Sequence, residues 1–348
     1  MASTTKLMTA YLALRELRLD ELIVAPPYDP IPGESLLGLR AGERITVHDL
    51  LYGLLLASGN DAAATLAEGV SGSESAFVAE MNDAAERIGL PHTSYGNPIG
   101  LDEPDNYSSA SDLVELAVLL LRDPAFRRVV DSPASRLDGG ERVREIVNRN
   151  NLVRTVPWIN GVKTGHTFAA GYVLVGSGTR KGVTLVSAVL GTASEVARDQ
   201  ATLDLLRYGF SLYDRREAVS ARERLDRVAL RFRDQSLPLL ASEDLRVTVR
   251  RGQDVRARVS APDEVDGPIA RGDRLGSVTV SVGGDAAGRV PLIAARSVAA
   301  ATIVDRADAA LPGGRAVVWI AAAALVIALL VALTAAVSPM LRRRAQPR

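Results

Sequence analysis

Apolar residues recur at helical spacing in the N-terminal half of the chain. In residues 4–15 the apolar positions lie three and four apart, which predicts an amphipathic helix. Residues 47–57 are apolar on nearly every side, so we expect a buried helix with Thr46 as its N-cap. The short polar triplet 58–60 then interrupts the run. Further helices are predicted over residues 61–68, 73–89, 111–122 and 195–213.

The pattern then changes to strands. Residues 158–164, 171–176 and 183–190 are apolar runs bounded by turn residues, and a hairpin-type connection joins the last two. A helical region followed by an antiparallel sheet predicts an α/β fold of the α+β type. Short alternating strands separated by Gly, Pro and Asp then predict a small all-β module. These strands cover residues 228–232, 245–250, 255–259, 275–282 and 289–293.

These patterns divide the chain into five segments. They are an α+β domain at 1–215, a β-rich domain at 216–296, a polar linker at 297–315, an apolar run at 316–337 and a basic tail at 338–348. The apolar run is long enough to cross a bilayer as one transmembrane helix, with a buried core helix as the alternative. Of the arginines that flank this run, most follow it, which predicts a cytoplasmic C-terminus and places the larger domains outside. We therefore expect a single-pass protein of the cell membrane.

Composition excludes several classes of function. The formal net charge is zero, so nothing in the charge balance favours a nucleic-acid partner. Cysteine is absent, which excludes disulfides and thiol catalysis. The histidines, His48, His92 and His166, lack the spacing of metal ligands. We predict neither a metal nor a cofactor.

Lysine usage singles out the candidate chemistry. The chain has only three lysines, Lys6, Lys163 and Lys181, and otherwise uses arginine for positive charge. A lysine amine, unlike a guanidinium, can be made neutral by its surroundings and can then act as a base. The first lysine lies one helical turn after Ser3, where it would activate the hydroxyl as a nucleophile. Lys181 lies in the hairpin connection and is interpreted as an ordinary surface residue.

Two further motifs follow the Ser3-x-x-Lys6 pair. Ser58-Gly59-Asn60 lies at the break between two predicted helices, and Lys163-Thr164-Gly165 lies on a predicted strand. Ser-x-x-Lys, Ser-x-Asn and Lys-Thr-Gly in this order are the signature of penicillin-binding proteins and serine β-lactamases. Each motif alone is weak, whereas the ordered set is a strong signal.

The chain resembles the D-alanyl-D-alanine carboxypeptidases of the low-molecular-mass penicillin-binding proteins. The resemblance implies a β-lactamase/transpeptidase-like first domain, and the β module with Pro268-Ile269-Ala270-Arg271-Gly272-Asp273 is similar to the C-terminal domain of that family. The segments that carry it in the first domain are Ala2-Ser3-Thr4-Thr5-Lys6, Ser58-Gly59-Asn60-Asp61, Asn97-Pro98-x-Gly100-Leu101, Gly161-Val162-Lys163-Thr164-Gly165-His166-Thr167 and Ala170-Gly171-Tyr172.

The resemblance implies an acyl-enzyme mechanism on the peptidoglycan stem peptide, with β-lactam antibiotics as inhibitors. Ser3 would attack the bond between two D-alanines with Lys6 as the general base. Ser58 would pass a proton to the leaving D-alanine, and Asn60 would orient Lys6 and the substrate amide.

The same family analogy assigns the binding residues. Lys163 would supply positive potential, and Thr164 would bind the terminal carboxylate with Arg198 in support. Gly165 and His166 complete the predicted binding segment. The backbone N–H groups of Ser3 and His166 would form the oxyanion hole.

The family also has strands before its Ser-x-x-Lys helix, and outward transfer of a large domain needs an export signal. Neither precedes Ser3 in this sequence. We therefore expect that the natural start lies upstream and that a signal peptide and N-terminal strands precede the present Met1.

Three rival functions remain. A class A β-lactamase would have Asp where this chain has Gly59 and a Glu-x-x-x-Asn motif, which is absent between Ser58 and Lys163. A transpeptidase differs only in whether water or an amine attacks the acyl-enzyme. A non-catalytic cell-wall binding or sporulation protein would need no nucleophile–base pair.

Overall fold

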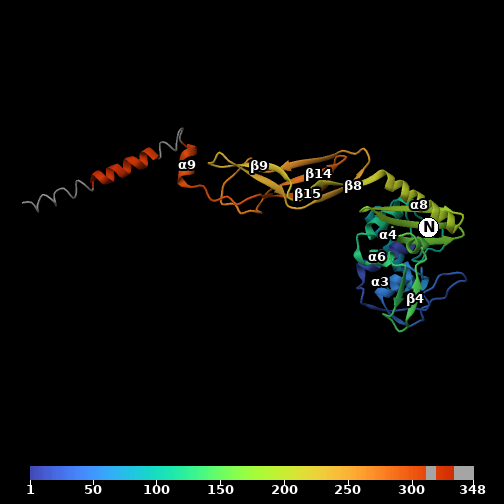
Figure 1. The fold of residues 1–348 in the computed structure, drawn as a ribbon. Coiled ribbons are helices and arrows are strands. Elements are labelled where there is room, and N and C mark those ends of the chain that lie inside the picture. Colours follow the sequence, from blue (N-terminus) through green and yellow to red (C-terminus); the bar gives the residue numbers. More distant parts are fainter. Residues whose placement is uncertain (311–318, 333–348) are drawn as a thin grey trace, which may run out of the picture. The chain divides into compact units, whose positions relative to one another are not determined.

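The computed structural model describes residues 1–310 and 319–332. The chain divides into two compact units, Met1–Asp214 and Arg215–Arg348, each of which is described by itself (Figure 1). The predicted order, an α+β region followed by an all-β module, is confirmed.

A three-stranded antiparallel sheet lies at the centre of the first unit. It consists of β5 (Ile159–Thr167), β6 (Gly171–Arg180) and β7 (Val183–Thr192), in the order β5-β6-β7. Each strand overlaps one of the predicted strand-like runs, and β5 begins one residue later than predicted. Neighbouring residues on a strand point to opposite faces; Leu174 accordingly packs into one apolar cluster and Val175 into another.

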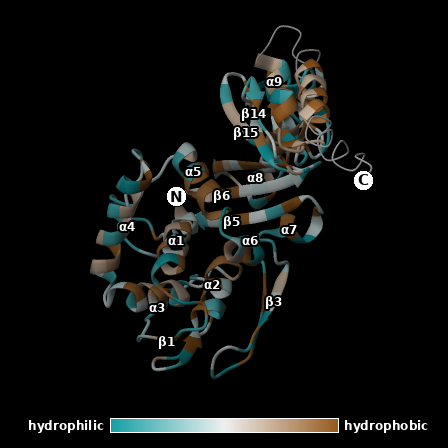
Figure 2. Cartoon of the chain, turned by 90° about the vertical axis from the view of Figure 1, so that its left-hand side faces the viewer, coloured by the Kyte–Doolittle hydropathy of each residue, from teal (hydrophilic) through white to brown (hydrophobic). Residues whose placement is uncertain are grey.

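Helices cover both faces of this sheet. The helices of the first unit are α1 (Lys6–Glu16), α2 (Val47–Leu55), α3 (Asn60–Ser71), α4 (Glu74–Ile88), α5 (Ala110–Leu120), α6 (Pro124–Val130), α7 (Asn151–Thr155) and α8 (Glu195–Leu212). Figure 2 shows α8 and α2 on opposite sides of β5 and β6. The larger cluster is built mainly from α1 to α6, and fully buried Leu50, Leu66 and Phe77 belong to it.

Sequence signals located the helix ends closely. Thr46 caps α2, its hydroxyl accepting a hydrogen bond from the Asp49 N–H. Ser73 likewise caps α4, and Gly89 ends that helix with a φ of 87°. This left-handed conformation costs glycine little, whereas a side chain would strain it.

The Pro- and Gly-rich composition of residues 20–45 predicts loops with short strands, and β1 (Leu22–Val24) pairs with β2 (Arg44–Thr46) there. Short elements of the later polar stretch were missed, namely helices α6 and α7 and the hairpin of β3 (Ala134–Leu137) with β4 (Arg144–Val147). Helix α6 has a recognisable start, because Asp123 caps it and Pro124 occupies its first turn. The three- and four-residue strands are too short to establish a periodic pattern, so packing decides them.

The second unit is built from strands. They are β8 (Tyr213–Val219), β9 (Arg224–Leu230), β10 (Ser236–Ala241), β11 (Leu245–Arg250), β12 (Val255–Ser260), β13 (Glu264–Val265), β14 (Arg274–Val282) and β15 (Asp285–Ala294). Six form a sheet in the order β12-β14-β15-β10-β9-β13, and β11 pairs with β8. A separate core that includes Val228, Leu239 and Val280 holds this unit together. The five predicted strands are present, and β8, β10 and β13 were missed.

The segment after the β-rich unit differs from the prediction. Residues 297–315 were expected to be a linker, but α9 (Ile303–Ala310) lies within them. Residues 319–332 are helical and exposed. Among residues 1–310 and 319–332, no helix has both the length and the apolar character needed to span a membrane. The predicted span 316–337 extends at both ends into residues outside the described part, and the predicted tail 338–348 lies wholly outside it.

We expect Leu50→Ala to destabilise the first unit by about 2–5 kcal/mol, because a fully buried leucine leaves a cavity when it is truncated. Urea unfolding, monitored by Trp158 fluorescence in a Trp319→Phe background, measures the free energy of unfolding of this unit. Leu205→Ala is the control, since Leu205 is 46% exposed and its loss should cost clearly less. Equal costs for both substitutions would contradict the core described above.

Candidate active site

The hydroxyl of Ser3 and the amine of Lys6 meet at the N-terminal end of α1. A 3-10 turn, Ala2–Thr5, leads directly into this helix, so the two side chains lie one turn apart. Lys6 Nζ donates a hydrogen bond to Ser3 Oγ at 3.1 Å. Lys6 is fully buried, whereas Ser3 is partly exposed. The nucleophile candidate is therefore accessible, and its basic partner is shielded from water.

Strand β5 passes close behind Ser3 at Gly165. A Cβ atom at this position would lie 2.9 Å from the Ser3 backbone nitrogen and 2.8 Å from a methyl group of Val173. Glycine is therefore required for the strand to approach the turn this closely. The Lys-Thr-Gly motif and the Ser-x-x-Lys motif are in this way brought against each other.

The triplet Ser58-Gly59-Asn60 forms the predicted break between α2 and α3. Ser58 has a φ of 62°, a left-handed conformation that is strained for a residue with a side chain. Gly59 lies against the loop before α2, where an added Cβ would be 2.9 Å from the Leu37 nitrogen. Helix α3 begins at Asn60, one residue earlier than predicted. The turn directs Ser58 and Asn60, both nearly buried, toward the two motif lysines.

Lys6 has a full set of acceptors in addition to Ser3. Its Nζ donates to Asn60 Oδ1 at 2.6 Å and to the Ile99 carbonyl at 2.6 Å. Burial lowers the pKa of Lys6 to about 7, and the positive charge of Arg149 acts in the same direction. Glu34 and Asp61 act against this lowering. A large fraction of Lys6 is therefore neutral near pH 7.

Lys163 contacts the second motif from strand β5. Its Nζ donates to Ser58 Oγ at 3.0 Å and to the Thr164 carbonyl at 2.9 Å. Burial lowers the pKa of Lys163 well below its usual value, with Lys6, Arg149 and Arg198 adding to the effect. We expected neutrality of Lys6 to require burial beside another positive charge, which Lys163 could provide. In the structure burial is the main cause, and Arg149 is the cation that lowers the pKa of Lys6.

The remaining predicted residues lie around this pair of lysines. Thr164 is buried, and the exposed ring of His166 packs on Tyr172 with the ring centroids 4.0 Å apart. Arg198 is buried on α8, and its Nη2 donates to Glu195 and Asp199, both at 2.8 Å. Its charge still acts on Lys163, so it lies within electrostatic range of the motif.

Comparison of the sequence with models of known protein families identifies the family to which these motifs belong. Residues 1–194 match the family model described as D-alanyl-D-alanine carboxypeptidase. The chain belongs to this D-alanyl-D-alanine carboxypeptidase family. Residues 214–300 match a second model, the penicillin-binding protein 5 C-terminal domain. The resemblance noted in the sequence is thereby confirmed for both units.

Individual carboxypeptidases of the family are similar over most of the chain. DacF of Bacillus subtilis is 30% identical over 303 residues, covering 84% of this chain and 78% of that protein. DacC of Escherichia coli is 29% identical over 313 residues, covering 85% and 78%.

Solved structures agree with this assignment. Penicillin-binding protein 5 of Haemophilus influenzae has a TM-score of 0.60 at 28% identity, covering 86% of this chain and 90% of that one. A serine-to-alanine mutant of the Streptomyces K15 DD-transpeptidase has a TM-score of 0.58 at 33% identity, covering 61% and 88%.

Several residues of this carboxypeptidase site gave no signal in the sequence. Glu34 and Tyr28 lie in the loop between β1 and β2, and Glu34 accepts a hydrogen bond from Asn60 Nδ2 at 2.9 Å. Ile99 contributes only its backbone carbonyl, so its side chain identity carries no information about the site. Arg149 acts through charge, and nothing distinguishes it in sequence from the many other arginines. The Asn97-Pro98 segment was noticed, but its role in presenting the Ile99 carbonyl was not.

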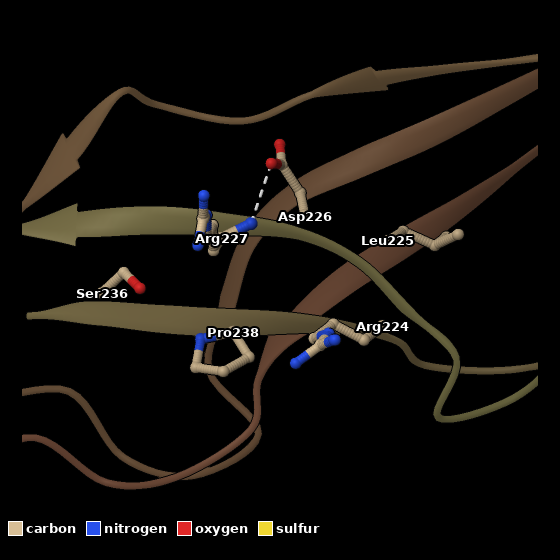
Figure 3. A pocket seen from close by; sticks show the side chains of 6 residues that line it. All are labelled: Arg224, Leu225, Asp226, Arg227, Ser236 and Pro238. Atoms are coloured by element: carbon tan, nitrogen blue, oxygen red, sulfur yellow. Dashed lines mark hydrogen bonds between the residues drawn. The ribbon is translucent and has the colours of Figure 1, made fainter.

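A pocket lies in the β-rich unit. Its volume is about 350 Å³, and Figure 3 shows the side chains of β9 and β10 that line it. It is lined by Arg224, Leu225, Asp226, Arg227, Ser236 and Pro238. All three lysines of the chain precede this unit. The unit therefore has no lysine that could act as a base for Ser236 of the pocket. The carboxypeptidase chemistry therefore belongs to the first unit.

We expect lysine NMR to detect the lowered pKa of Lys6 directly, because the chain has only three lysines. After lysine-specific ¹³C labelling, the Lys6 signal should titrate near pH 7, far below the usual lysine pKa of about 10.4. Lys6→Arg assigns the signal by removing it. A Lys6 signal that titrates near pH 10 would contradict the buried, partly neutral amine.

Proposed function

We propose that this chain is a serine-type D-Ala-D-Ala carboxypeptidase that removes the terminal D-alanine from peptidoglycan stem pentapeptides. The observation that carries the proposal is the 3.1 Å hydrogen bond between Ser3 Oγ and the buried Lys6 amine, whose pKa is about 7. A hydroxyl beside an amine that loses its proton near pH 7 has both a nucleophile and a base in place. Membership of the carboxypeptidase family supplies the substrate class.

In the acylation step, Ser3 Oγ attacks the carbonyl carbon of the penultimate D-alanine, and neutral Lys6 takes the hydroxyl proton. The new bond joins Ser3 oxygen to carbon, and the bond to the terminal D-alanine nitrogen breaks. Asn60 and the Ile99 carbonyl hold the Lys6 amine in position through their 2.6 Å hydrogen bonds. An arginine in the place of Lys6 could not take the proton, because a guanidinium stays charged.

The leaving D-alanine nitrogen needs a proton. Ser58 is suited to deliver it, because its hydroxyl is linked to Lys163 at 3.0 Å and can donate on one side while it accepts on the other. Ser58 passes on to this nitrogen the proton that Lys6 took from Ser3, so that Lys6 is neutral again. Water then attacks the acyl-enzyme, Lys6 takes one of its protons and returns it to Ser3 Oγ as the ester bond breaks, and the shortened peptide leaves with a new carboxylate. The Ser3 hydroxyl is regenerated in this step.

Binding of the substrate carboxylate would fall to Thr164, Lys163 and Arg198. An incoming carboxylate beside Lys163 favours the protonated amine, so the substrate itself would restore the positive charge that burial disfavours. The backbone N–H groups of Ser3 and His166 would bind the oxyanion, and loss of such a donor typically slows catalysis about 100- to 1,000-fold. Penicillins, whose strained amide would acylate the same serine, are expected to inhibit.

Transpeptidation is the second candidate activity. The likeness to the Streptomyces K15 DD-transpeptidase favours it, because that protein is 33% identical over 61% of this chain. The two activities share the acyl-enzyme and differ in whether water or an amine resolves it. Gly59 of the second motif argues against a β-lactamase. The intact nucleophile–base pair argues against a purely binding protein.

We expect Ser3→Ala to abolish covalent labelling by a fluorescent penicillin and to lower D-alanine release from a pentapeptide by at least about a thousandfold, since the nucleophile is gone. Ser75→Ala is the matched control, because Ser75 is an exposed serine of α4. Labelling that persists in Ser3→Ala would place the acylated residue elsewhere. Absence of labelling in the unsubstituted chain would favour the binding function.

We also propose that residues 316–337 anchor the protein in the cell membrane, with the preceding part of the chain on the outer side and the C-terminus in the cytoplasm. The support comes from the apolar composition of this run and from the arginines that follow it. Its described portion, residues 319–332, is helical with exposed apolar side chains such as Leu325 and Val331.

The full chain, exported in a bacterial cell behind a cleavable signal peptide, is expected to stay with the membrane after alkaline carbonate extraction. A chain ending at residue 315 should be released into the soluble fraction, because it lacks the apolar run. Release of the full chain by carbonate would contradict a spanning anchor.

A further inference from the structure

Glu34 reaches the catalytic motifs from a loop that the sequence motifs do not include. Its Oε2 accepts a hydrogen bond from Asn60 Nδ2 at 2.9 Å and another from the Tyr28 hydroxyl. Its Oε1 accepts from the Ile31 backbone N–H at 3.2 Å. The side chain is only partly exposed, and both of its oxygens are engaged. Glu34 is therefore held in one position at the edge of the Lys6 cluster.

The loop that carries Glu34 is itself attached to the second motif. Asp61, the residue after Asn60, accepts hydrogen bonds from the backbone N–H groups of Leu37 at 2.7 Å and of Gly38 at 2.7 Å. The Asn60 N–H in turn donates to the Ser35 carbonyl at 2.7 Å. These bonds place the backbone on the C-terminal side of Glu34 at a set distance from Asn60.

The contact between Glu34 and Asn60 determines which way the Asn60 amide points. An amide has a donor end and an acceptor end, and a carboxylate can only accept. With Glu34 beside the amide nitrogen, the Oδ1 end faces Lys6 and accepts its 2.6 Å hydrogen bond. The reversed amide would place an NH₂ group against the amine and an oxygen against the carboxylate, losing both bonds.

We propose that Glu34 is a positioning residue for the reaction: through Asn60 it holds the Lys6 amine toward Ser3, and its negative charge sets how readily that amine loses its proton. This inference rests on the proposed role of Lys6 as the base.

Three charged groups shift the pKa of Lys6, and they act in opposite directions. Arg149 favours the neutral amine, whereas Glu34 and Asp61 favour the protonated one. Lys163 is also close by, and its own pKa is lowered by Lys6. Asp61 is occupied by the loop backbone. Glu34 is linked to Lys6 through the side chain of Asn60. Its charge can therefore be removed while Asp61 still holds the loop.

The carboxylate is ionised in the working pH range. Desolvation acts to raise the pKa of Glu34, but hydrogen bonds from Tyr28 and Asn60 outweigh it and lower the pKa below its usual value. Its charge is therefore present wherever Lys6 titrates. Removing this charge lowers the pKa of Lys6, and the neutral amine then persists to lower pH.

The test is Glu34→Gln in the full chain, compared with Glu16→Gln. Glu16 is an exposed carboxylate at the end of the same helix as Lys6, so its substitution changes the net charge equally without touching the site. Lysine NMR gives the titration of Lys6, and D-alanine release from a pentapeptide gives the pH profile of kcat/KM.

For Glu34→Gln we expect the Lys6 titration and the acid limb of kcat/KM to move together to lower pH. We also expect the plateau of kcat/KM to fall about tenfold, because the hydrogen bond that orients Asn60 loses its charged acceptor and becomes weaker. Glu16→Gln should change neither quantity. A Glu34→Gln variant with an unmoved Lys6 titration and acid limb would overturn the proposal, even if its plateau fell, because a purely structural role predicts that pattern.

Failure of this inference is separable from failure of the proposed function. If the unsubstituted chain releases no D-alanine, the function is wrong, and the NMR titration still decides whether Glu34 controls Lys6. If the chain is active and Glu34→Gln leaves the Lys6 signal in place, only the inference is wrong.

Discussion

Removal of two lysine amines from water is the constraint on which the site depends. Lys6 and Lys163 are both essentially inaccessible, and burial is the first cause of the lowered pKa of each. An unpaired ammonium in such surroundings costs several kcal/mol, so a buried lysine either finds acceptors or loses its proton. Here both responses operate, because Lys6 has three acceptors and a pKa of about 7. For a serine D-alanyl-D-alanine carboxypeptidase, this supplies a base near neutral pH without a histidine.

Several separate elements of the fold supply the residues that surround these two amines. Helix α1 and its preceding turn supply Ser3 and Lys6, the α2–α3 break supplies Ser58 and Asn60, and β5 supplies Lys163. Two local features make these contacts possible: Gly165 has no side chain where β5 passes Ser3, and Ser58 has a left-handed conformation. The left-handed conformation costs free energy and persists because the surrounding core determines it. Stability elsewhere in the first unit therefore supports a strained site.

Much of the architecture followed from local signals. The caps at Thr46 and Ser73 and the stop at Gly89 matched the observed helix ends, because these residues satisfy or terminate helix hydrogen bonds within a few positions. The short hairpin β3–β4 did not follow, since four residues carry no periodicity. Helix α9 was likewise taken for linker, because residues 303–310 bury none of their side chains.

The sequence by itself determined the reaction class, because the order and spacing of Ser3, Lys6, Ser58, Asn60 and Lys163 specify chemical groups that few other arrangements would combine. Only the tertiary structure decided how the base is tuned. Glu34, Arg149 and the Ile99 carbonyl come from loops far apart in the chain and act on Lys6 through charge and backbone atoms. Electrostatic effects depend on distance and burial, which the order of residues along a chain does not contain.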